Sequence, residues 1–492
     1  MDKTKENDKE MFFQRAVDHA KQGRFMEALA DYDRVIGLDP RDFAAHSNRG
    51  NALTELGHFA EALASFERAI AIKSNLAFLH YNQGVVLERL GRMEEALASY
   101  EHALALSPDY AAAHCNRGAM FGALGRHVEA VRDLERSIVL KPTAVAFNNL
   151  GFSLLSLGRR EEALRGFEHA LALDPQYIYA SYNRAVLQLA SGNYQDGFKN
   201  YESRLMRPDN PLPRRFAQPQ WRGEPIDGKT ILLHVEQGLG DSIQMLRYLP
   251  MLKARAAHVL LELQPALVPL LGPMAAGLTV LKTGQVIPPF DVYCPMMSLP
   301  LAFGARVDAI PAHAPYLTIP QERIPQWRER LPSGAVPRIG LVWSSGSLGP
   351  GKGRNRSIAL ELLAPLLAVP GLGFVSLQRE YRDHDPPALA RLPIERIDEG
   401  LADFADTAAA IAQCDLVISV DTSVAHLAGA LGKPVWILLP YVADWRWLLD
   451  RSDSPWYPSA RLFRQSQVGD WEGLIREVAK ELSRYRAAFL RA

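Results

Sequence analysis

Glycine recurs at a nearly constant interval through the first 200 residues, and this period constrains the fold more than any other feature. The successive spacings are 34, 34, 34, 33 and 34 residues. The recurring glycines are Gly23, Gly57, Gly91, Gly125, Gly158 and Gly192. Internal repeats of this length are supersecondary units that bury their apolar faces by stacking on one another. The sequence therefore predicts an α-helical repeat array.

The residues between these glycines are typical of tetratricopeptide repeats, which are helix–turn–helix units of about 34 residues. A small residue such as Gly50 lets the two helices of a unit approach closely, and a bulky one such as Phe66 fills the space between them. Prolines such as Pro40 follow the second helix, which they cannot continue. We predict six tetratricopeptide repeats over residues 8–205.

An asparagine recurs at one position of the first helix in five of these repeats. The recurring residues are Asn48, Asn82, Asn116, Asn149 and Asn183. A primary amide both donates and accepts hydrogen bonds, so a row of asparagines can hold an extended polypeptide by its backbone. The row resembles the asparagine ladder of the protein O-linked N-acetylglucosamine transferases, which implies an acceptor groove. Alternatively, these amides bond within or between the repeats.

The composition excludes several classes of protein. The 492 residues carry 55 basic and 55 acidic side chains and show no basic stripe, which argues against a nucleic-acid partner. The three cysteines lack metal-ligand spacing, and we expect them to be reduced. The charged first residues do not resemble a secretory signal, and no apolar run reaches about 18 residues, so we expect no membrane span. We expect a cytoplasmic protein.

The pattern changes after the repeats. Residues 206–229 are rich in proline, which is typical of a connector. Beyond them, short apolar strands alternate with helical segments, and this alternation predicts parallel sheets covered on both faces. We predict two α/β lobes, 230–335 and 336–492, that face a cleft.

The first candidate site in this half is the turn from Glu236 to Asp241, which follows a strand and opens a helix. Gly238 and Gly240 allow a ligand to approach the backbone closely, and free N–H groups at the helix start favour anions. Asp241 is a candidate base, or alternatively only a helix cap. Glu236 at the strand end is the other candidate base.

The second candidate site is the segment Asp421-Thr422-Ser423, which follows the buried strand DLVISV. Ligands of parallel sheets bind at the carboxyl ends of the strands. The hydroxyls of Thr422 and Ser423, with the N–H groups of the next helix, suit a diphosphate. The alternative is that this segment caps the helix and that His426 is a core residue.

Together these motifs resemble the bacterial tetratricopeptide-linked glycosyltransferases. These are related to the heptosyltransferases (glycosyltransferase family 9) and distantly to the O-linked N-acetylglucosamine transferases. The resemblance rests on EQGLGDSIQMLRYLP, the VW strand with RNRS, and ISVDTSVAHLAGALGKPVWILLP. It implies a GT-B fold of two Rossmann-like lobes, a nucleotide-diphosphate sugar as co-substrate without a further cofactor, and metal-independent inverting transfer. By the same motifs, Asp241 matches the general base, and Asp421, Thr422, Ser423 and His426 match the donor-binding segment.

Such a transferase needs cations that stabilise the departing diphosphate. Lys352, Arg354 and Arg356 in the glycine-rich loop are the candidates, and Arg446 and Gln378 are further candidate donor-binding residues. The DxD sequence at Asp383 spells a metal signature, but it precedes two prolines in an expected surface turn and we assign it no metal.

We therefore predict a glycosyltransferase whose repeats select the acceptor, possibly a protein. Two alternatives stay open. The acceptor can be a lipopolysaccharide or another glycan, or the chain can be a non-catalytic scaffold with a sugar-nucleotide-binding body.

Overall fold

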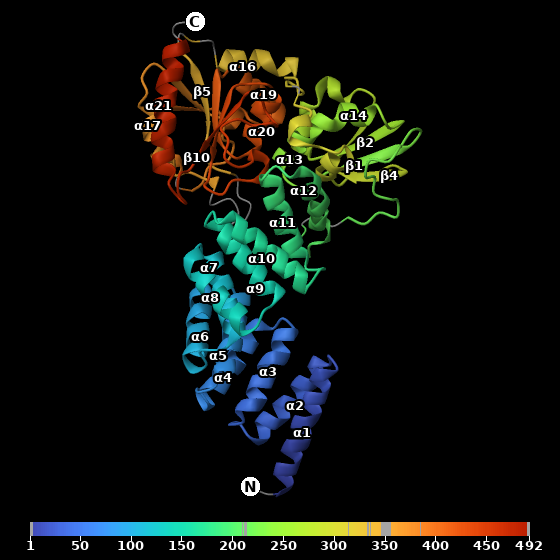
Figure 1. Ribbon diagram of the computed structural model, residues 1–492, viewed down its shortest axis with the longest axis vertical. Coiled ribbons are helices and arrows are strands. Elements are labelled where there is room, and N and C mark those ends of the chain that lie inside the picture. Colours follow the sequence, from blue (N-terminus) through green and yellow to red (C-terminus); the bar gives the residue numbers. More distant parts are fainter. Residues whose placement is uncertain are drawn as a thin grey trace. The chain divides into compact units, whose positions relative to one another are not determined.

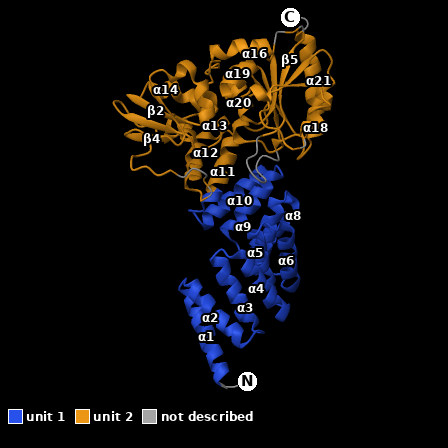
Figure 2. Cartoon of the chain, turned by 180° about the vertical axis from the view of Figure 1, so that it is seen from behind, with its two compact units in different colours: residues 1–180 blue, residues 181–492 orange. Residues whose placement is uncertain are grey.

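The computed structural model describes residues 3–208, 210, 214–312, 314–331, 334, 336–345, 356–383 and 385–489. The chain divides into two compact units, Met1–Ala180 and Ser181–Ala492, which Figure 2 shows in different colours. We call them the repeat unit and the sheet unit. The division falls near the start of α11, so most of the sixth predicted repeat belongs to the sheet unit.

Twelve helices among the described residues form the repeats (Figure 1). They are α1 (Lys3–Lys21), α2 (Phe25–Leu38), α3 (Phe43–Glu55), α4 (Phe59–Ile72), α5 (Ala77–Arg89), α6 (Met93–Leu106), α7 (Ala111–Ala123), α8 (His127–Leu140), α9 (Ala144–Ser156), α10 (Arg160–Leu173), α11 (Ile178–Ala190) and α12 (Tyr194–Tyr201). One of the periodic glycines lies in the turn of each pair, with φ between 73° and 83°. Only glycine adopts this left-handed backbone without strain, which explains the period.

Close packing within each repeat follows the predicted pairing of small with bulky side chains. A Cβ atom at Gly50 would lie 2.8 Å from the Phe66 ring, and one at Gly151 would lie 2.7 Å from the Phe167 ring. The helices of a pair therefore approach too closely for any side chain at these glycines. The helical repeat prediction is confirmed.

The sheet unit contains two parallel sheets (Figure 1). The first sheet has the strand order β3-β2-β1-β4 and the second has β10-β9-β8-β5-β6-β7. The strands are β1 (Thr230–His234), β2 (His258–Leu263), β3 (Leu278–Lys282), β4 (Val292–Pro295), β5 (Arg338–Val342), β6 (Gly373–Ser376), β7 (Ile394–Arg396), β8 (Leu416–Val420), β9 (Val435–Leu439) and β10 (Ala460–Arg464). The α-helices that follow or cover them are α13 (Leu239–Met245), α14 (Leu249–Lys253), α15 (Leu299–Ala302), α16 (Ile324–Arg330), α17 (Ala364–Leu367), α18 (Asp385–Leu389), α19 (Phe404–Ala412), α20 (Ser423–Ala430) and α21 (Trp471–Phe489).

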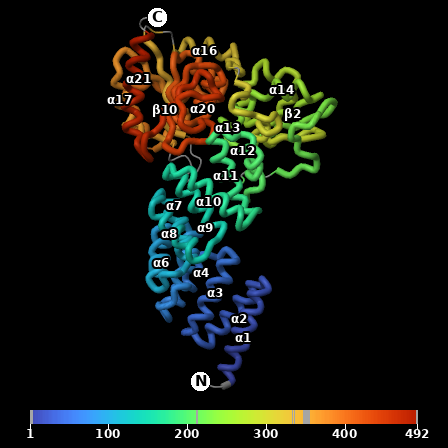
Figure 3. Tube along the Cα trace, in the orientation of Figure 1, coloured from blue at the N-terminus to red at the C-terminus, as the bar shows by residue number. Residues whose placement is uncertain are grey.

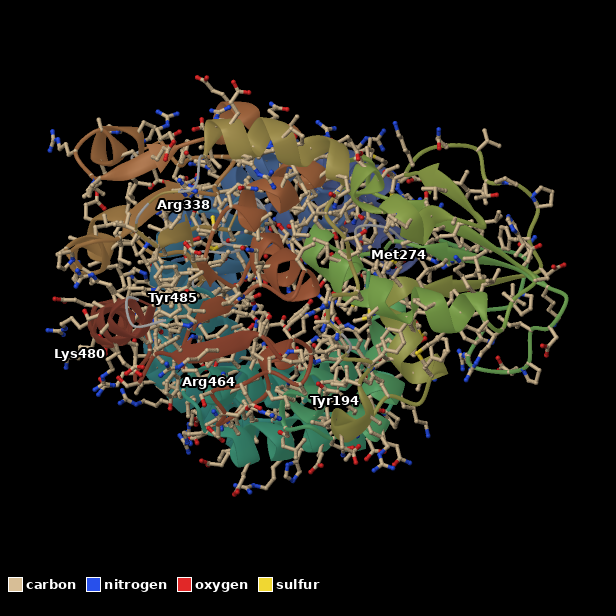
Figure 4. All side chains as sticks on the ribbon, turned by 90° about the horizontal axis from the view of Figure 1, so that it is seen from above. Tyr194, Met274, Arg338, Arg464, Lys480 and Tyr485 are labelled. Atoms are coloured by element: carbon tan, nitrogen blue, oxygen red, sulfur yellow. The ribbon has the colours of Figure 1, made fainter. Side chains whose placement is uncertain are left out.

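Apolar clusters cover both faces of the second sheet, as its continuous apolar strands predict. Successive residues of β8 enter different clusters: Val417 packs with residues of α19 and α20, and Ile418 packs with residues of α21. The sixth repeat joins the first of these clusters through Tyr194, which is labelled in Figure 4. Figure 3 follows the chain from α11 through α12 to the first sheet.

The sixth repeat is bonded into the sheet unit by an aromatic cluster. The Trp456 indole N–H donates to the Tyr194 hydroxyl over 2.9 Å. The Trp445 ring makes edge contacts with Tyr194, Phe198 and Tyr201 of α12 at centroid distances of 5.5–6.3 Å. These large rings are almost fully buried, so their burial fixes α12 against the loop that contains Trp445.

Candidate functional site

Each sheet has one point where the strand order reverses direction. In the first sheet it lies between β1 and β4, and in the second it lies between β5 and β8. The crevice outside the carboxyl ends of parallel strands at such a point is where ligands bind in open α/β sheets. The segments that end β1 and β8 contain both motifs that the sequence predicted as sites.

A polar cavity of about 220 Å³ brings these two motifs together. We call it the first pocket. The segment after β1 and helix α13 contribute Gln237 and Asp241, and α11 and α12 contribute Tyr182, Val186 and Tyr201. The remaining lining residues come from the second sheet's loops and α20: Arg356, Asp421, His426, Asp444, Trp445 and Arg446. Three carboxylates and two guanidinium groups therefore face one small space.

Asp241 lies in this pocket with both carboxylate oxygens engaged. One oxygen accepts a hydrogen bond of 2.7 Å from the Gly238 N–H, which is the capping contact that the sequence allowed. The other accepts a hydrogen bond of 2.5 Å from Arg446. Burial raises the pKa of Asp241 above its ordinary value, although Arg446 opposes this. A carboxylate with a raised pKa is a stronger base than an ordinary aspartate.

Arg446 crosses from the second sheet's loops to the segment after β1. Besides Asp241, its guanidinium donates to the Gln244 side chain over 2.8 Å and to Asp444 over 2.7 Å. It also lies over the Trp445 ring, 4.5 Å from the centroid. Burial alone would raise the pKa of Asp444, but Arg446 holds that pKa below its ordinary value. Arg446 therefore remains the cation that neutralises this part of the pocket.

Asp421 follows β8 and is almost fully buried. Burial and, to a smaller extent, the neighbouring Asp444 raise its pKa to about 6, although Arg356 opposes this rise. Its nearest cation is Arg356, whose Nη1 lies 3.5 Å from a carboxylate oxygen. Arg356 keeps about a third of its side chain exposed and so can also reach a ligand in the pocket.

His426 is neutral and fixed. Burial lowers its pKa to about 3, its Nδ1 lies 2.8 Å from the Tyr457 hydroxyl, and its ring stacks on Trp447 at 5.2 Å. A Cβ at Gly240 would lie only 2.7 Å from the His426 ring. The second glycine of the motif therefore lets α13 pack against α20, rather than providing a flexible loop.

Thr422 and Ser423 lie at the start of α20, as predicted, and both are partly exposed. Thr422 is the residue before the first turn of the helix, and its hydroxyl bonds to the Ser419 hydroxyl over 3.0 Å. Its side chain makes no capping hydrogen bond to the helix. The Thr422 side chain therefore does not cap the helix.

Two predicted residues have structural partners instead of a place in the first pocket. The Glu236 carboxylate accepts two hydrogen bonds from Arg204, of 2.8 and 3.0 Å, and one from the Met297 N–H. Buried and fully paired, it does not have the geometry of a base. The Gln378 oxygen accepts from the Trp343 and Ser344 N–H groups, so this side chain holds the loop after β5.

The glycine-rich basic loop is only partly described. Lys352 and Arg354 lie outside the described residues, and only Arg356 of the three predicted cations can be placed. Asp385 of the DxD sequence is fully buried and bonds to Arg382 and to the Trp343 indole. This aspartate therefore stabilises the fold.

The asparagine row makes contacts between repeats, which is the alternative to a free groove. Asn82 donates to Asn51 of the preceding repeat over 3.1 Å. Asn116 donates to the Tyr81 hydroxyl of the preceding repeat and to the Tyr100 hydroxyl, each over 3.3 Å. Asn149 accepts from Asn148 over 3.2 Å. Asn48 bonds to the Tyr32 side chain. Asn183 belongs to the sheet unit.

The sequence did not single out the aromatic wall of the first pocket. Tyr182 and Tyr201 stack on each other at 5.6 Å, and the Gln237 side chain donates to the Tyr201 hydroxyl over 3.2 Å. Tyr182 precedes Asn183 at a position where the other repeats have phenylalanine, serine, tyrosine, cysteine or asparagine. No periodic signal therefore marks this tyrosine as a site residue.

Known protein families match segments of both the repeats and the second sheet's region. Tetratricopeptide repeat models match residues 13–77, 89–125 and 144–177. The model for glycosyltransferase family 9 (heptosyltransferase) matches residues 400–439, which include β8, Asp421 and His426. The match covers only part of a domain and suggests glycosyl transfer.

Protein FlbA of Caulobacter vibrioides is 31% identical over 333 residues, which are 62% of this chain. The matched region spans 55% of the length of FlbA. Among solved structures, YrrB, described as a TPR protein with an unusual peptide-binding site, is 26% identical, with a TM-score of 0.31 over 34% of this chain and 88% of that one. A tetratricopeptide repeat protein from Parabacteroides merdae is 20% identical, with a TM-score of 0.36 over 40% of this chain and 78% of that one. The chain is thus a tetratricopeptide-repeat protein with glycosyltransferase-like character.

Among the described residues, none of the helices combines the length and the apolar character that a membrane span needs. No group of three or more histidine, cysteine, aspartate or glutamate side chains among the same residues is arranged to hold a metal ion.

Proposed function

We propose that this protein transfers a sugar from a nucleoside-diphosphate donor to a hydroxyl group of an acceptor, with inversion at the anomeric carbon. In this proposal the two parallel sheets are the two lobes of a GT-B fold. The single observation that carries it is the first pocket, where the partly buried carboxylate of Asp241 from the first sheet's side meets cations and a helix start from the second sheet's side.

The donor diphosphate would bind at the start of α20. The N–H groups there and the hydroxyls of Thr422 and Ser423 suit phosphate oxygens. Arg356 and Arg446 would neutralise the charge that develops on the departing diphosphate. The carboxylate of Asp421 would orient Arg356 rather than contact the phosphates.

Asp241 would act as the base. It would take the proton of the acceptor hydroxyl, whose oxygen then bonds to the anomeric carbon while the carbon–diphosphate oxygen bond breaks. Attack from the face opposite the leaving group inverts that carbon. Because Arg446 holds one Asp241 oxygen, the diphosphate and the base would compete for this guanidinium. Donor binding would then free Asp241 to accept a proton.

The acceptor would approach from the sixth repeat, whose tyrosines line the pocket. Asn82 and Asn116 are engaged between repeats, so the asparagine row gives weaker support for a polypeptide groove than the sequence suggested. A polypeptide acceptor stays a proposal, and a glycan acceptor is the second candidate.

The test separates binding from turnover. We expect the wild type to bind UDP or GDP in titration calorimetry and to hydrolyse or transfer the matching sugar nucleotide. Asp241→Asn should lower turnover by about 100-fold or more, because base catalysis contributes about 10² to 10⁴ in rate. It should not weaken diphosphate binding, because it removes the charge that competes for Arg446. Arg356→Ala should weaken diphosphate binding.

The matched control is Asp308→Asn, an exposed aspartate paired with Arg306 on the surface. It should change neither property. Full turnover by Asp241→Asn would disprove the base assignment. Binding of a nucleoside diphosphate without turnover on protein, peptide and glycan acceptors would favour the non-catalytic scaffold.

A further inference from the structure

Helices α13 and α20 pack directly against each other where the first sheet meets the second (Figure 1). Helix α13 follows β1 of the first sheet, and α20 follows β8 of the second. The approach is so close that a Cβ atom at Gly240 would lie 2.7 Å from the His426 ring. Clefts between two layers of this kind commonly close around a ligand by hinge bending, which needs an interface that can separate. The contacts around α13 therefore determine whether this joint can open.

One apolar cluster runs without interruption across the joint. It contains Ile231 of β1, Val417 of β8, Leu427 of α20 and Phe198 of α12, all almost fully buried. Two compact layers are expected to move relative to each other unless their interface is large and apolar. Here the interface is part of the core itself, so opening the joint would expose core side chains to water.

Arg247 adds a buried cation to this interface. It lies in the short 3-10 helix Leu246–Tyr248, directly after α13, and is 3% exposed. Its guanidinium donates to the Trp456 carbonyl oxygen over 2.7 Å, and it lies 4.8–5.0 Å from the centroids of the Tyr316, Trp456 and Tyr457 rings. These rings belong to the connection between the sheets and to the segment before β10. Separating the sheets would take the cation away from rings whose attraction desolvation strengthens.

The sixth repeat binds both sides of the joint. Towards the first sheet, the Tyr201 hydroxyl accepts a hydrogen bond from Gln237 over 3.2 Å, and Arg204 donates to Glu236 over 2.8 Å. Towards the second sheet, the Tyr201 ring contacts the Trp445 ring at a centroid distance of 6.0 Å. One short segment therefore holds the backbone after β1 and the loop after β9. A rotation of either sheet would break its contacts on one side.

We propose that the sixth repeat and Arg247 hold the two sheets as one rigid body, so that the first pocket exists before a ligand arrives and does not close by hinge bending. The rigid joint follows from these contacts alone, and only its response to a nucleotide rests on the proposed function. The sixth repeat is then a structural part of the sheet unit, although its sequence assigns it to the repeats. Because the populated state is the binding-competent one, no part of the binding free energy is used to close the pocket.

Double electron–electron resonance on the full chain measures the distance between the two sheets' outer helices. Spin labels are attached at Met251→Cys on α14 and at Lys480→Cys on α21, because both side chains are exposed and both helices are rigid supports. The native cysteines, Cys115, Cys294 and Cys414, are buried, so they stay unlabelled in the folded chain. The probes are UDP, GDP and inorganic pyrophosphate, and titration calorimetry follows their binding.

The labelled chain should give one narrow distance, which the probes shift by less than about 2 Å, the displacement that separates pre-organised complexes from hinge closure. Trp445→Ala removes the ring that the sixth repeat contacts and should broaden the distance distribution. Arg247→Met should also broaden it, so the test does not depend on one variant folding. Trp436→Ala is the matched control, because this indole is also buried but packs with Phe463 in the cluster on the other face of the second sheet. It should leave the distance narrow.

A broad or two-peaked distance without a probe, or a shift of more than about 2 Å with any probe, overturns the proposal. The same holds if folded Trp445→Ala and Arg247→Met both give a distance as narrow as that of Trp436→Ala. A narrow distance in a chain that binds neither UDP, GDP nor pyrophosphate would leave the rigid joint standing while the proposed function fails.

Discussion

Replacing Asp421 by asparagine should stabilise the sheet unit at neutral pH. The carboxyl of an aspartate has an ordinary pKa of 3.8, whereas burial raises that of folded Asp421 to about 6. Between these two values the folded chain binds more protons than the unfolded chain. The free energy of unfolding therefore falls as the pH rises through this window. Asparagine carries no charge, so the variant escapes this loss.

The structure sets the size of the effect. The difference between 3.8 and about 6 corresponds to about 3 kcal/mol, at about 1.4 kcal/mol per pH unit. The pKa of about 6 already includes the opposing effects of Arg356 and the Trp447 side chain on the ionised carboxylate. We expect Asp421→Asn and the wild type to be equally stable near pH 4. The variant should be more stable by up to about 3 kcal/mol near pH 7.

Tryptophan fluorescence during urea unfolding measures this in the sheet unit alone. All eight tryptophans lie beyond residue 220, so the repeat unit contributes none of the signal. The pKa of buried His426 is lowered to about 3, so in both proteins this residue makes the free energy of unfolding rise with pH, opposite to the effect of Asp421. The free energies of unfolding of the variant and the wild type are therefore subtracted at each pH. The reasoning is refuted if this difference is constant from pH 4 to pH 8, or if the variant is less stable at pH 7.

Two further substitutions test how the site is built. Gly240→Ala should lower the free energy of unfolding by about 1–3 kcal/mol, because its Cβ would overlap the fixed His426 ring. Gly238→Ala should cost less in the same urea titration, because its Cβ would lie 3.3 Å from an oxygen of Asp241, which is a longer distance. Arg204→Met should cost about 3–5 kcal/mol because it leaves buried Glu236 unpaired, and adding Glu236→Gln should restore part of this. Equal stability of the two glycine variants, or no restoration by the second change, would contradict these contacts.

The repeats were predictable because their signals are local. A glycine with φ near 75° in each turn and a small residue opposite a bulky ring are contacts within about 34 residues, and each leaves a periodic mark. The parallel sheets were predictable for a related reason, since strands buried on both faces read as continuous apolar runs. The segments that end β1 and β8 could therefore be selected as candidate sites before any contact was known.

The partners of the site residues could not be predicted in the same way. Asp241 and Arg446 are 205 residues apart, and neither residue's surroundings in the chain indicate the other. Glu236 shows the reverse problem: its place at a strand end suggested a base, but Arg204, 32 residues earlier in the connection from the repeats, neutralises it. Such pairing depends on the side to which a side chain points where the strand ends, and neighbouring residues point to different sides. Gln237 lines the first pocket, whereas the preceding residue, Glu236, bonds to Arg204.

The sixth repeat links these observations. Its period and its glycine turn assign it to the solenoid, yet its tyrosines pack on Trp445 and line the first pocket. Arg446 directly follows Trp445, so the burial of that indole against α12 fixes the backbone that carries the guanidinium. The guanidinium in turn holds the carboxylate of Asp241. A repeat built into the sheets in this way can couple the identity of the acceptor to the geometry of the base. The earlier repeats make their asparagine contacts within a separate unit.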